Sequence, residues 1–278
     1  MDFVEIFKAI ILGIVEGITE WLPISSTGHM ILVNEFLHSN LSEQFQNVFL
    51  VVIQLGAILA VVLLYWKKIF PFSFKKGEIV KVDIIVMWLK IAVACIPAAI
   101  VGVLWDEDID RLFYHYQTVA IALIVFGILF IVIENRNAHL RPRINSLSEI
   151  TYKTAILIGL FQLVAAVFPG VSRSGATIIG AIMIGVARSV ATEYTFFLAI
   201  PVMLGASLLK VVKYEGSFSS TELIVLAAGM LTAFLVSIVI IQFLTEYIKK
   251  HNFKIFGWYR IVLGIVVIGY FLVKSYVM

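Results

Sequence analysis

Apolar residues dominate this chain in long uninterrupted runs, and short polar stretches separate the runs. An α-helix needs about 20 apolar residues to cross the hydrocarbon core of a bilayer. Six segments reach this length and are predicted to be membrane-spanning helices: 45–66, 86–105, 114–134, 193–212, 222–245 and 256–276. The pattern predicts an all-α integral membrane protein with six transmembrane helices.

Two further apolar segments, 4–37 and 150–188, are interrupted near their middle by proline, glycine and small hydroxyl residues. Both are too interrupted to form two full spans each. Each is therefore predicted to be a re-entrant helical hairpin that returns to the side from which it entered. Backbone that leaves helix inside a membrane must be buried in protein or face a water-filled cavity. The two interruptions are where we expect a polar site.

The two halves of the chain share one order of elements, a hairpin followed by three spans. Three is an odd number, so the second half starts on the opposite side of the membrane and the repeats are inverted. Pro23 aligns with Pro169, and Ser25 aligns with Ser172 after one inserted residue. Paired broken segments indicate a site near the bilayer midplane. The prediction is a single membrane domain, 1–278, with repeat 1 at about 1–135 and repeat 2 at about 150–278.

Composition supports the membrane assignment and excludes other classes. The chain is 61% hydrophobic and 14% charged, whereas soluble domains contain about 25% charged residues. The net charge is only +3, and the basic residues lie between apolar runs, so no nucleic-acid partner is expected. Cys95 is the one cysteine in the sequence, which excludes an internal disulfide.

The positions of lysine and arginine predict the orientation. One side of the predicted topology collects Lys67, Lys68, Lys75, Lys76, Lys81, Arg136, Arg141, Arg143, Lys153, Arg188, Lys249, Lys250 and Lys254. The other side has few basic residues and the acidic run Asp106-Glu107-Asp108. Cytoplasmic loops carry the excess of lysine and arginine. Both termini and the first hairpin therefore face outside, and the second hairpin enters from the cytoplasm.

The first broken segment carries two carboxylates, Glu16 and Glu20, four residues apart. This spacing predicts that they share a helix face. Carboxylates inside a membrane are costly and are functional by default. Two of them this close repel, so either one is protonated or a cation bridges the pair. The alternative is a pair that reaches the interface from a helix end.

A polar run follows in the same segment: Ser25, Ser26, Thr27, Gly28 and His29. The hydroxyl residues can cap the returning half-helix, whose free N–H groups and positive dipole end suit a phosphate. Gly28 allows close backbone approach. His29 is a candidate general acid or base near neutral pH. The alternative is a histidine with a structural role.

The second broken segment supplies a cation, Arg173. A guanidinium at membrane depth needs an anion and matches phosphate oxygens in a bidentate fork. The alternative is an Arg173–Glu20 ion pair without a ligand. The neighbouring phosphate-binding candidates are Ser172, Ser174, Gly175 and Thr177.

Gln54 lies near the middle of the first full span and is a candidate hydrogen-bond partner for the same centre. Interhelical hydrogen bonding is the alternative. Gln162 and Tyr194 are weaker candidates of this kind. From the residues alone, the sequence indicates a membrane site for a phosphorylated ligand.

Two motifs resemble the signatures of the undecaprenyl-diphosphatase family, the bacitracin-resistance phosphatases of bacterial inner membranes. They are Glu16-Gly-Ile-Thr-Glu-Trp-Leu-Pro-Ile-Ser-Ser-Thr-Gly-His29 and Pro169-Gly-Val-Ser-Arg-Ser-Gly-Ala-Thr177. The resemblance implies hydrolysis of undecaprenyl diphosphate to undecaprenyl phosphate and inorganic phosphate. This reaction recycles the lipid carrier for cell-wall synthesis, and bacitracin competes for the same substrate. It also implies a multi-pass protein of the inner membrane whose active site opens to the outer, periplasmic face.

Carried over by motif, the catalytic residues are Glu16, Glu20, Ser26, His29 and Arg173. A divalent cation, Mg²⁺ or Ca²⁺, is usually associated with the family's activity. Glu16 and Glu20 are its candidate ligands here, and the alternative is a cation bound mainly by the diphosphate. The nucleophile stays open between Ser26, His29 and water. The sequence does not give the oligomeric state, and a homodimer is one of the open alternatives. The rival function is an inverted-repeat transporter or flippase for a phosphorylated lipid or anion, because such proteins also use broken helices.

Overall fold

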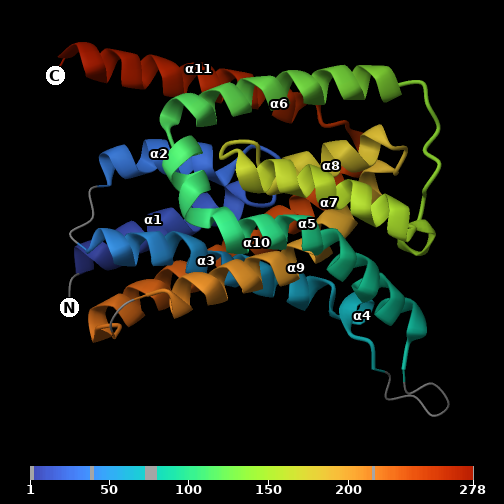
Figure 1. Ribbon diagram of the computed structural model, residues 1–278, viewed down its shortest axis with the longest axis horizontal. Coiled ribbons are helices and arrows are strands. Elements are labelled where there is room, and N and C mark those ends of the chain that lie inside the picture. Colours follow the sequence, from blue (N-terminus) through green and yellow to red (C-terminus); the bar gives the residue numbers. More distant parts are fainter. Residues whose placement is uncertain (1–2, 38–40, 73–79, 215–216, 278) are drawn as a thin grey trace.

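The computed structural model describes residues 3–37, 41–72, 80–214 and 217–277, and these residues are helical apart from short connections and two isolated bridges (Figure 1). Side chains at 106 and 277 are not described. The helices in chain order are α1 Phe3–Thr19, α2 Ser26–Phe36, α3 Glu43–Leu64, α4 Trp66–Ile69, α5 Val82–Phe113, α6 Tyr116–Asn137, the 3-10 turn Leu147–Glu149, α7 Tyr152–Val167, α8 Arg173–Met183, α9 Arg188–Val212, α10 Ser220–Lys250 and α11 Lys254–Val277.

Six of these helices are long and apolar enough to cross a bilayer, which confirms the predicted number of spans within the described residues. They are α3, α5, α6, α9, α10 and α11. Helix α5 continues to Phe113, but its backbone leaves helical geometry at Trp105, where the predicted span ends. Lys75 and Lys76, which contributed to the predicted orientation, lie outside the described residues.

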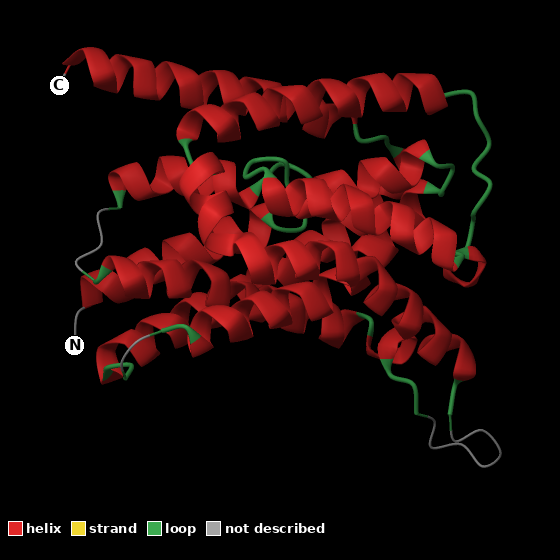
Figure 2. Cartoon of the chain, viewed as in Figure 1, coloured by secondary structure: helices red, strands yellow, loops and turns green. Residues whose placement is uncertain are grey.

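The two predicted interruptions are present as loops between pairs of short helices. The first loop (residues 20–25) joins α1 to α2, and the second loop (residues 168–172) joins α7 to α8. Irregular backbone lies in the middle of the molecule with helices around it (Figure 2). Helix α1 ends at Thr19, so Glu20 lies just past the helix instead of inside it as predicted. The Glu20 N–H still donates to the Glu16 carbonyl at 3.0 Å, which keeps both acids close to the helix end.

In both broken segments, the first helix packs closely against a long span. Helix α1 packs along α10, and α7 packs along α5. A Cβ on Gly13 would lie 2.6 Å from the Gly229 carbonyl oxygen, and one on Gly159 would lie 2.3 Å from the Ala94 carbonyl oxygen. Since neither distance is sterically possible, glycine is required at both positions. The two broken helices are therefore held tightly against long spans.

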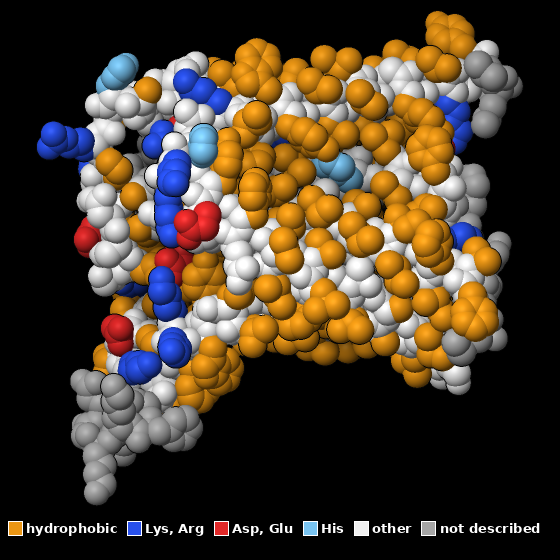
Figure 3. Space-filling model, turned by 180° about the vertical axis from the view of Figure 1, so that it is seen from behind, with side chains coloured by type: hydrophobic (Ala, Val, Ile, Leu, Met, Phe, Trp, Pro, Cys, Tyr) orange, Lys and Arg blue, Asp and Glu red, His pale blue; other side chains and the backbone are white. Residues whose placement is uncertain are grey.

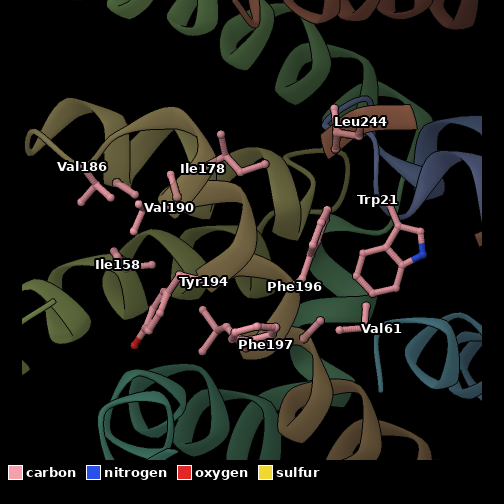
Figure 4. Packing of buried hydrophobic residues seen from close by; sticks show 14 of the residues in the cluster. Trp21, Val61, Ile158, Ile178, Val186, Val190, Tyr194, Phe196, Phe197 and Leu244 are labelled. Atoms are coloured by element: carbon pink, nitrogen blue, oxygen red, sulfur yellow. The ribbon is translucent and has the colours of Figure 1, made fainter. Parts of the chain in front are cut away.

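Apolar side chains of the interior pack against the first loop. Trp21, in the first loop, is fully buried and meets Phe196 of α9 edge to face with ring centroids 5.3 Å apart (Figure 4). The outer surface is also apolar over a broad area, and charged side chains gather along one edge of it (Figure 3). An apolar outer surface, with polar groups confined to the edge and to a buried cluster, is the arrangement required of a protein in lipid.

Candidate functional site

The two loops meet through an ion pair. Arg173, the first residue of α8, donates from Nη2 to Glu20 Oε1 at 2.9 Å, and the two side chains are only 12% and 8% exposed. Arg173 Nη1 donates to the Thr195 carbonyl of α9 at 3.1 Å. Ser26, the first residue of α2, donates from Oγ to the other oxygen of Glu20 at 3.0 Å. Glu20 thus binds the predicted cation and one of the candidate nucleophiles at the same time.

Two helix N-termini converge on this cluster. Ser25 caps α2 and accepts a hydrogen bond from Gly28 N at 3.3 Å, and Ser172 caps α8 and accepts from Gly175 N at 3.1 Å. The prediction that a hydroxyl residue caps the first returning helix is confirmed by Ser25, and Ser172 plays the same part in the second. First-turn N–H groups and the positive dipole end of each helix favour an anion. Together with Arg173, they form a positive region of the kind that favours an anion.

His29 lies one turn into α2, and both of its ring nitrogens are engaged. Nδ1 lies 2.7 Å from the Ser25 carbonyl oxygen, and Nε2 lies 2.7 Å from the Tyr259 hydroxyl of α11. A carbonyl only accepts, so Nδ1 carries a proton and a neutral ring accepts from Tyr259 at Nε2. The Ser26 hydroxyl is therefore bonded to the carboxylate of Glu20 and not to the imidazole.

Glu16 is the most enclosed acid of the cluster. Its side chain is 1% exposed and interacts with the Glu20 carboxyl and with the Arg173 charge. Its Oε1 is buried without a hydrogen-bond partner among the described residues. Two carboxyl groups this close need a proton or a cation between them. No hydrogen bond among the described residues thus compensates the burial of this oxygen.

Ser174 and Thr177, which follow the second loop, form hydrogen bonds around Arg173. Ser174 Oγ donates to the Glu20 carbonyl at 3.0 Å and lies 3.2 Å from Ser172 Oγ. Thr177 donates to the Arg173 carbonyl at 2.9 Å and accepts from Thr195 Oγ1 at 2.9 Å. These hydroxyls join the backbone around Arg173 to the first loop and to α9.

Not every candidate has a contact that links it to the cluster. Gln54 on α3 is half-buried, and no hydrogen bond of the described residues joins it to the two loops. Gln162 on α7 is buried, and neither atom of its amide has a partner among the described residues. Thr27 and Gly28 occupy the first turn of α2, as predicted, and Gly175 occupies the first turn of α8.

Three residues near the loops were missed by sequence reasoning. Tyr259 and Arg260 come from α11, and Thr195 comes from α9. Arg260 could have been found, since an arginine inside an apolar span is functional by default. The sequence placed it close to the start of a span, where a basic residue is ordinary. Neither Tyr259 nor Thr195 carries a sequence signal that separates it from other polar residues in spans.

Comparison with known proteins assigns the chain to a family. Residues 9–266 match the family model described as bacitracin resistance protein BacA. The chain is 67% identical to undecaprenyl-diphosphatase 1 of Clostridium acetobutylicum, over 98% of this chain and 100% of that protein. It is 64% identical to undecaprenyl-diphosphatase of Desulfitobacterium hafniense, over 99% of both. It is 58% identical to undecaprenyl-diphosphatase of Enterococcus faecalis, over 96% of this chain and 98% of that protein.

Proposed function

The chain belongs to the bacitracin resistance protein BacA family, and we propose that its site hydrolyses undecaprenyl diphosphate to undecaprenyl phosphate and inorganic phosphate. The reaction renews the lipid carrier used in cell-wall synthesis. One structural observation carries this function. A guanidinium, two carboxylates and two helix N-termini meet at the ends of two loops inside an apolar protein.

The cationic side of the site binds the phosphates. Arg173 and the first-turn N–H groups of α2 and α8 hold the phosphate oxygens. They also stabilise the charge that develops as the phosphoryl group is transferred in line. The Arg173–Glu20 ion pair is compatible with this role because Arg173 Nε has no hydrogen-bond partner in the described part of the chain. That N–H remains available to a phosphate oxygen.

The chemistry follows from the Ser26–Glu20 hydrogen bond. Ser26 Oγ attacks the terminal phosphorus and gives its proton to the Glu20 carboxylate. The bond from this phosphorus to the bridging oxygen breaks, and undecaprenyl phosphate leaves. Water then hydrolyses the phosphoserine, which releases inorganic phosphate and restores Ser26. His29 provides general acid–base catalysis in the same site.

Two other routes compete with this one, His29 as the nucleophile and direct attack by water. Rapid quench with labelled substrate separates the three routes. An acid-stable phosphoprotein supports Ser26, whereas an acid-labile one supports His29. The absence of any labelled protein during turnover favours direct attack by water and overturns the serine route.

A divalent cation, Mg²⁺ or Ca²⁺, is also proposed. Glu16 and Glu20 would hold it, and the unpartnered Glu16 Oε1 is an available donor. The described residues contain no group of three or more His, Cys, Asp or Glu side chains arranged for a metal. The donor set thus fits a cation that shares its ligands with the diphosphate, as Mg²⁺ commonly does. When bound, such a cation neutralises phosphate charge.

The finer architecture is proposed as two re-entrant hairpins in an inverted repeat. The support is local: both loops end in a serine with positive φ, at 73° for Ser25 and 69° for Ser172. The packing of α1 on α10 also has a counterpart in that of α7 on α5.

We place the protein in the bacterial inner membrane with its site open to the periplasmic face. A thiol reagent that cannot cross membranes tests this in intact cells, using single cysteines in a Cys95→Ser background. Ser217→Cys should react, and Ser148→Cys should react only after permeabilisation. The opposite pattern reverses the orientation.

Purified protein in detergent with undecaprenyl diphosphate tests the function itself. Release of inorganic phosphate, abolished by Ser26→Ala, supports the hydrolase. Bacitracin should suppress this release by sequestering the substrate. The broken helices at membrane depth also suit a flippase. Movement of labelled lipid across vesicles without phosphate release would favour that function instead. Light scattering of the purified protein decides whether it forms a homodimer.

A further inference from the structure

Arg260, in the second turn of α11, is a buried cation without an acid. Its side chain is 0% exposed, and no carboxylate forms an ion pair with it in the described part of the chain. Its Nε has no hydrogen-bond partner among those residues. Burying an unpaired guanidinium is costly, and ionisable residues inside a membrane protein mark function. The position therefore needs an explanation beyond packing.

The guanidinium of Arg260 binds both loops. Nη1 donates to the Pro23 carbonyl at 3.3 Å, and Nη2 donates to the Gly170 carbonyl at 3.0 Å and the Val171 carbonyl at 2.8 Å. Counted back from the cap, Pro23 and Gly170 occupy corresponding positions, since each lies two residues before the serine that caps the following helix. One side chain thus joins the same point of the two loops.

Packing leaves the guanidinium little freedom to move. The rings of Phe126 and Phe130 on α6 lie 5.8 Å and 5.9 Å from Arg260 Cζ. On the other side, a Cβ added to Gly175 would lie 2.9 Å from Nη1. The fork is therefore held between α6 and the first turn of α8, with its donors directed at the loop carbonyls.

The cap serines, which come one or two residues after these carbonyls, are strained. Ser25 and Ser172 have φ of 73° and 69°, a region that residues other than glycine rarely adopt. Such a conformation persists only when the surroundings over-determine it. Each serine is fixed on its C-terminal side by its cap bond and on its N-terminal side by a carbonyl bound to Arg260. Arg260 thus helps hold both helix N-termini in place.

We infer that Arg260 is a positioning residue that fixes the two loops relative to each other, and thereby sets Ser26 and Arg173 in register. The expected effect of Arg260 on turnover rests on the proposed function. Its expected effect on the position of the loops rests only on the geometry described above. Lysine cannot replace it. A planar guanidinium directs several N–H donors at the three carbonyls at once, whereas a single ammonium group cannot reach all three. In the described part of the chain, all hydrogen bonds of Arg260 go to loop carbonyls.

Hydrogen exchange in detergent tests the geometric part without an activity assay. In Arg260→Lys, peptides covering residues 20–28 and 168–176 should both exchange at least tenfold faster, while peptides of α3 and α6 exchange as in the wild type. Arg188→Lys is the matched control, because Arg188 pairs with the buried Glu134 away from the loops and should leave both peptides unchanged. Unchanged exchange in either loop, or a uniform rise throughout the chain, overturns the proposal.

Turnover tests the functional part. Arg260→Lys should lower kcat at least 30-fold and change KM less than threefold, because misplaced groups still bind substrate but no longer align. Arg188→Lys should retain kcat within threefold. A normal kcat in a variant whose loops exchange faster rejects Arg260 as a positioning residue. If wild-type protein releases no phosphate, the proposed function fails, and the hydrogen-exchange result still decides the link between the loops.

Discussion

Glu20 and Arg173 are 153 residues apart in the chain and form an ion pair of 2.9 Å that joins the two loops. Glu20 also accepts a hydrogen bond from Ser26, so one carboxylate connects the cation of one half to the hydroxyl of the other. An Arg173–Glu20 ion pair that binds no ligand is the alternative to an anion-binding role for Arg173. The two capped helix N-termini beside it favour an anion site.

Arg173→Lys should reduce kcat/KM by about 100-fold or more, in the range seen when a donor to a developing anion is removed. Lysine keeps the positive charge but has no guanidinium fork. In the wild type, this fork bonds to Glu20 and to the Thr195 carbonyl, and its Nε has no partner among the described residues. Steady-state phosphate release measures the effect. Activity within threefold of the wild type would remove Arg173 from the mechanism.

Glu16→Gln should raise the Mg²⁺ concentration for half-maximal activity at least tenfold, since it removes one of two charges proposed to hold the cation. The measurement is phosphate release titrated with Mg²⁺ at fixed substrate. A variant that loses activity but keeps the wild-type Mg²⁺ dependence would assign the acidic pair to acid–base chemistry instead.

Tyr259→Phe should lower kcat about 2- to 10-fold, the equivalent of one hydrogen bond, because His29 Nε2 loses the hydroxyl at 2.7 Å. His29→Ala should lower kcat much further. Tyr270→Phe is a matched control on the same helix, where the hydroxyl bonds to Glu35 at 3.4 Å. Equal effects of the two phenylalanine variants would contradict a specific role for Tyr259.

Gly13→Ala should destabilise the protein by about 1–3 kcal/mol, the usual effect of overpacking. The new Cβ would lie 2.6 Å from the Gly229 carbonyl oxygen and force α1 away from α10. Thermal unfolding in detergent measures this as a lower midpoint. Gly102→Ala is the control, since no atom lies within 4 Å of its added Cβ. Its midpoint should be unchanged or higher, because alanine is the better helix former.

Several features were predictable because they depend on local sequence. The six spans follow from the length of apolar runs, and the two loops follow from proline and glycine inside such runs. Ser25 and Ser172 were predictable as caps, since serine before an apolar helix is the usual N-cap. Glu16 and Arg173 stood out because charge is costly in lipid.

Other features depend on contacts between distant elements. The partner of Ser26 proved to be Glu20 and not His29, because the fold gives both imidazole nitrogens other partners. Nothing near Arg260 in the chain indicates that it binds the carbonyls of two remote loops. A hydrogen bond requires a few tenths of an ångström of precision across the packed interior, and hydropathy does not encode such distances.

By itself, the sequence determined which segments span the membrane, where helices are interrupted, and which charged residues inside apolar segments are candidates for function. Hydrophobic length, proline geometry and the cost of desolvating charge act locally and can be derived from composition and order. Only the tertiary structure decided that α11 supplies Tyr259 and Arg260 to the two loops. That assignment depends on how whole helices pack, and packing is set jointly by many weak contacts spread over the entire chain.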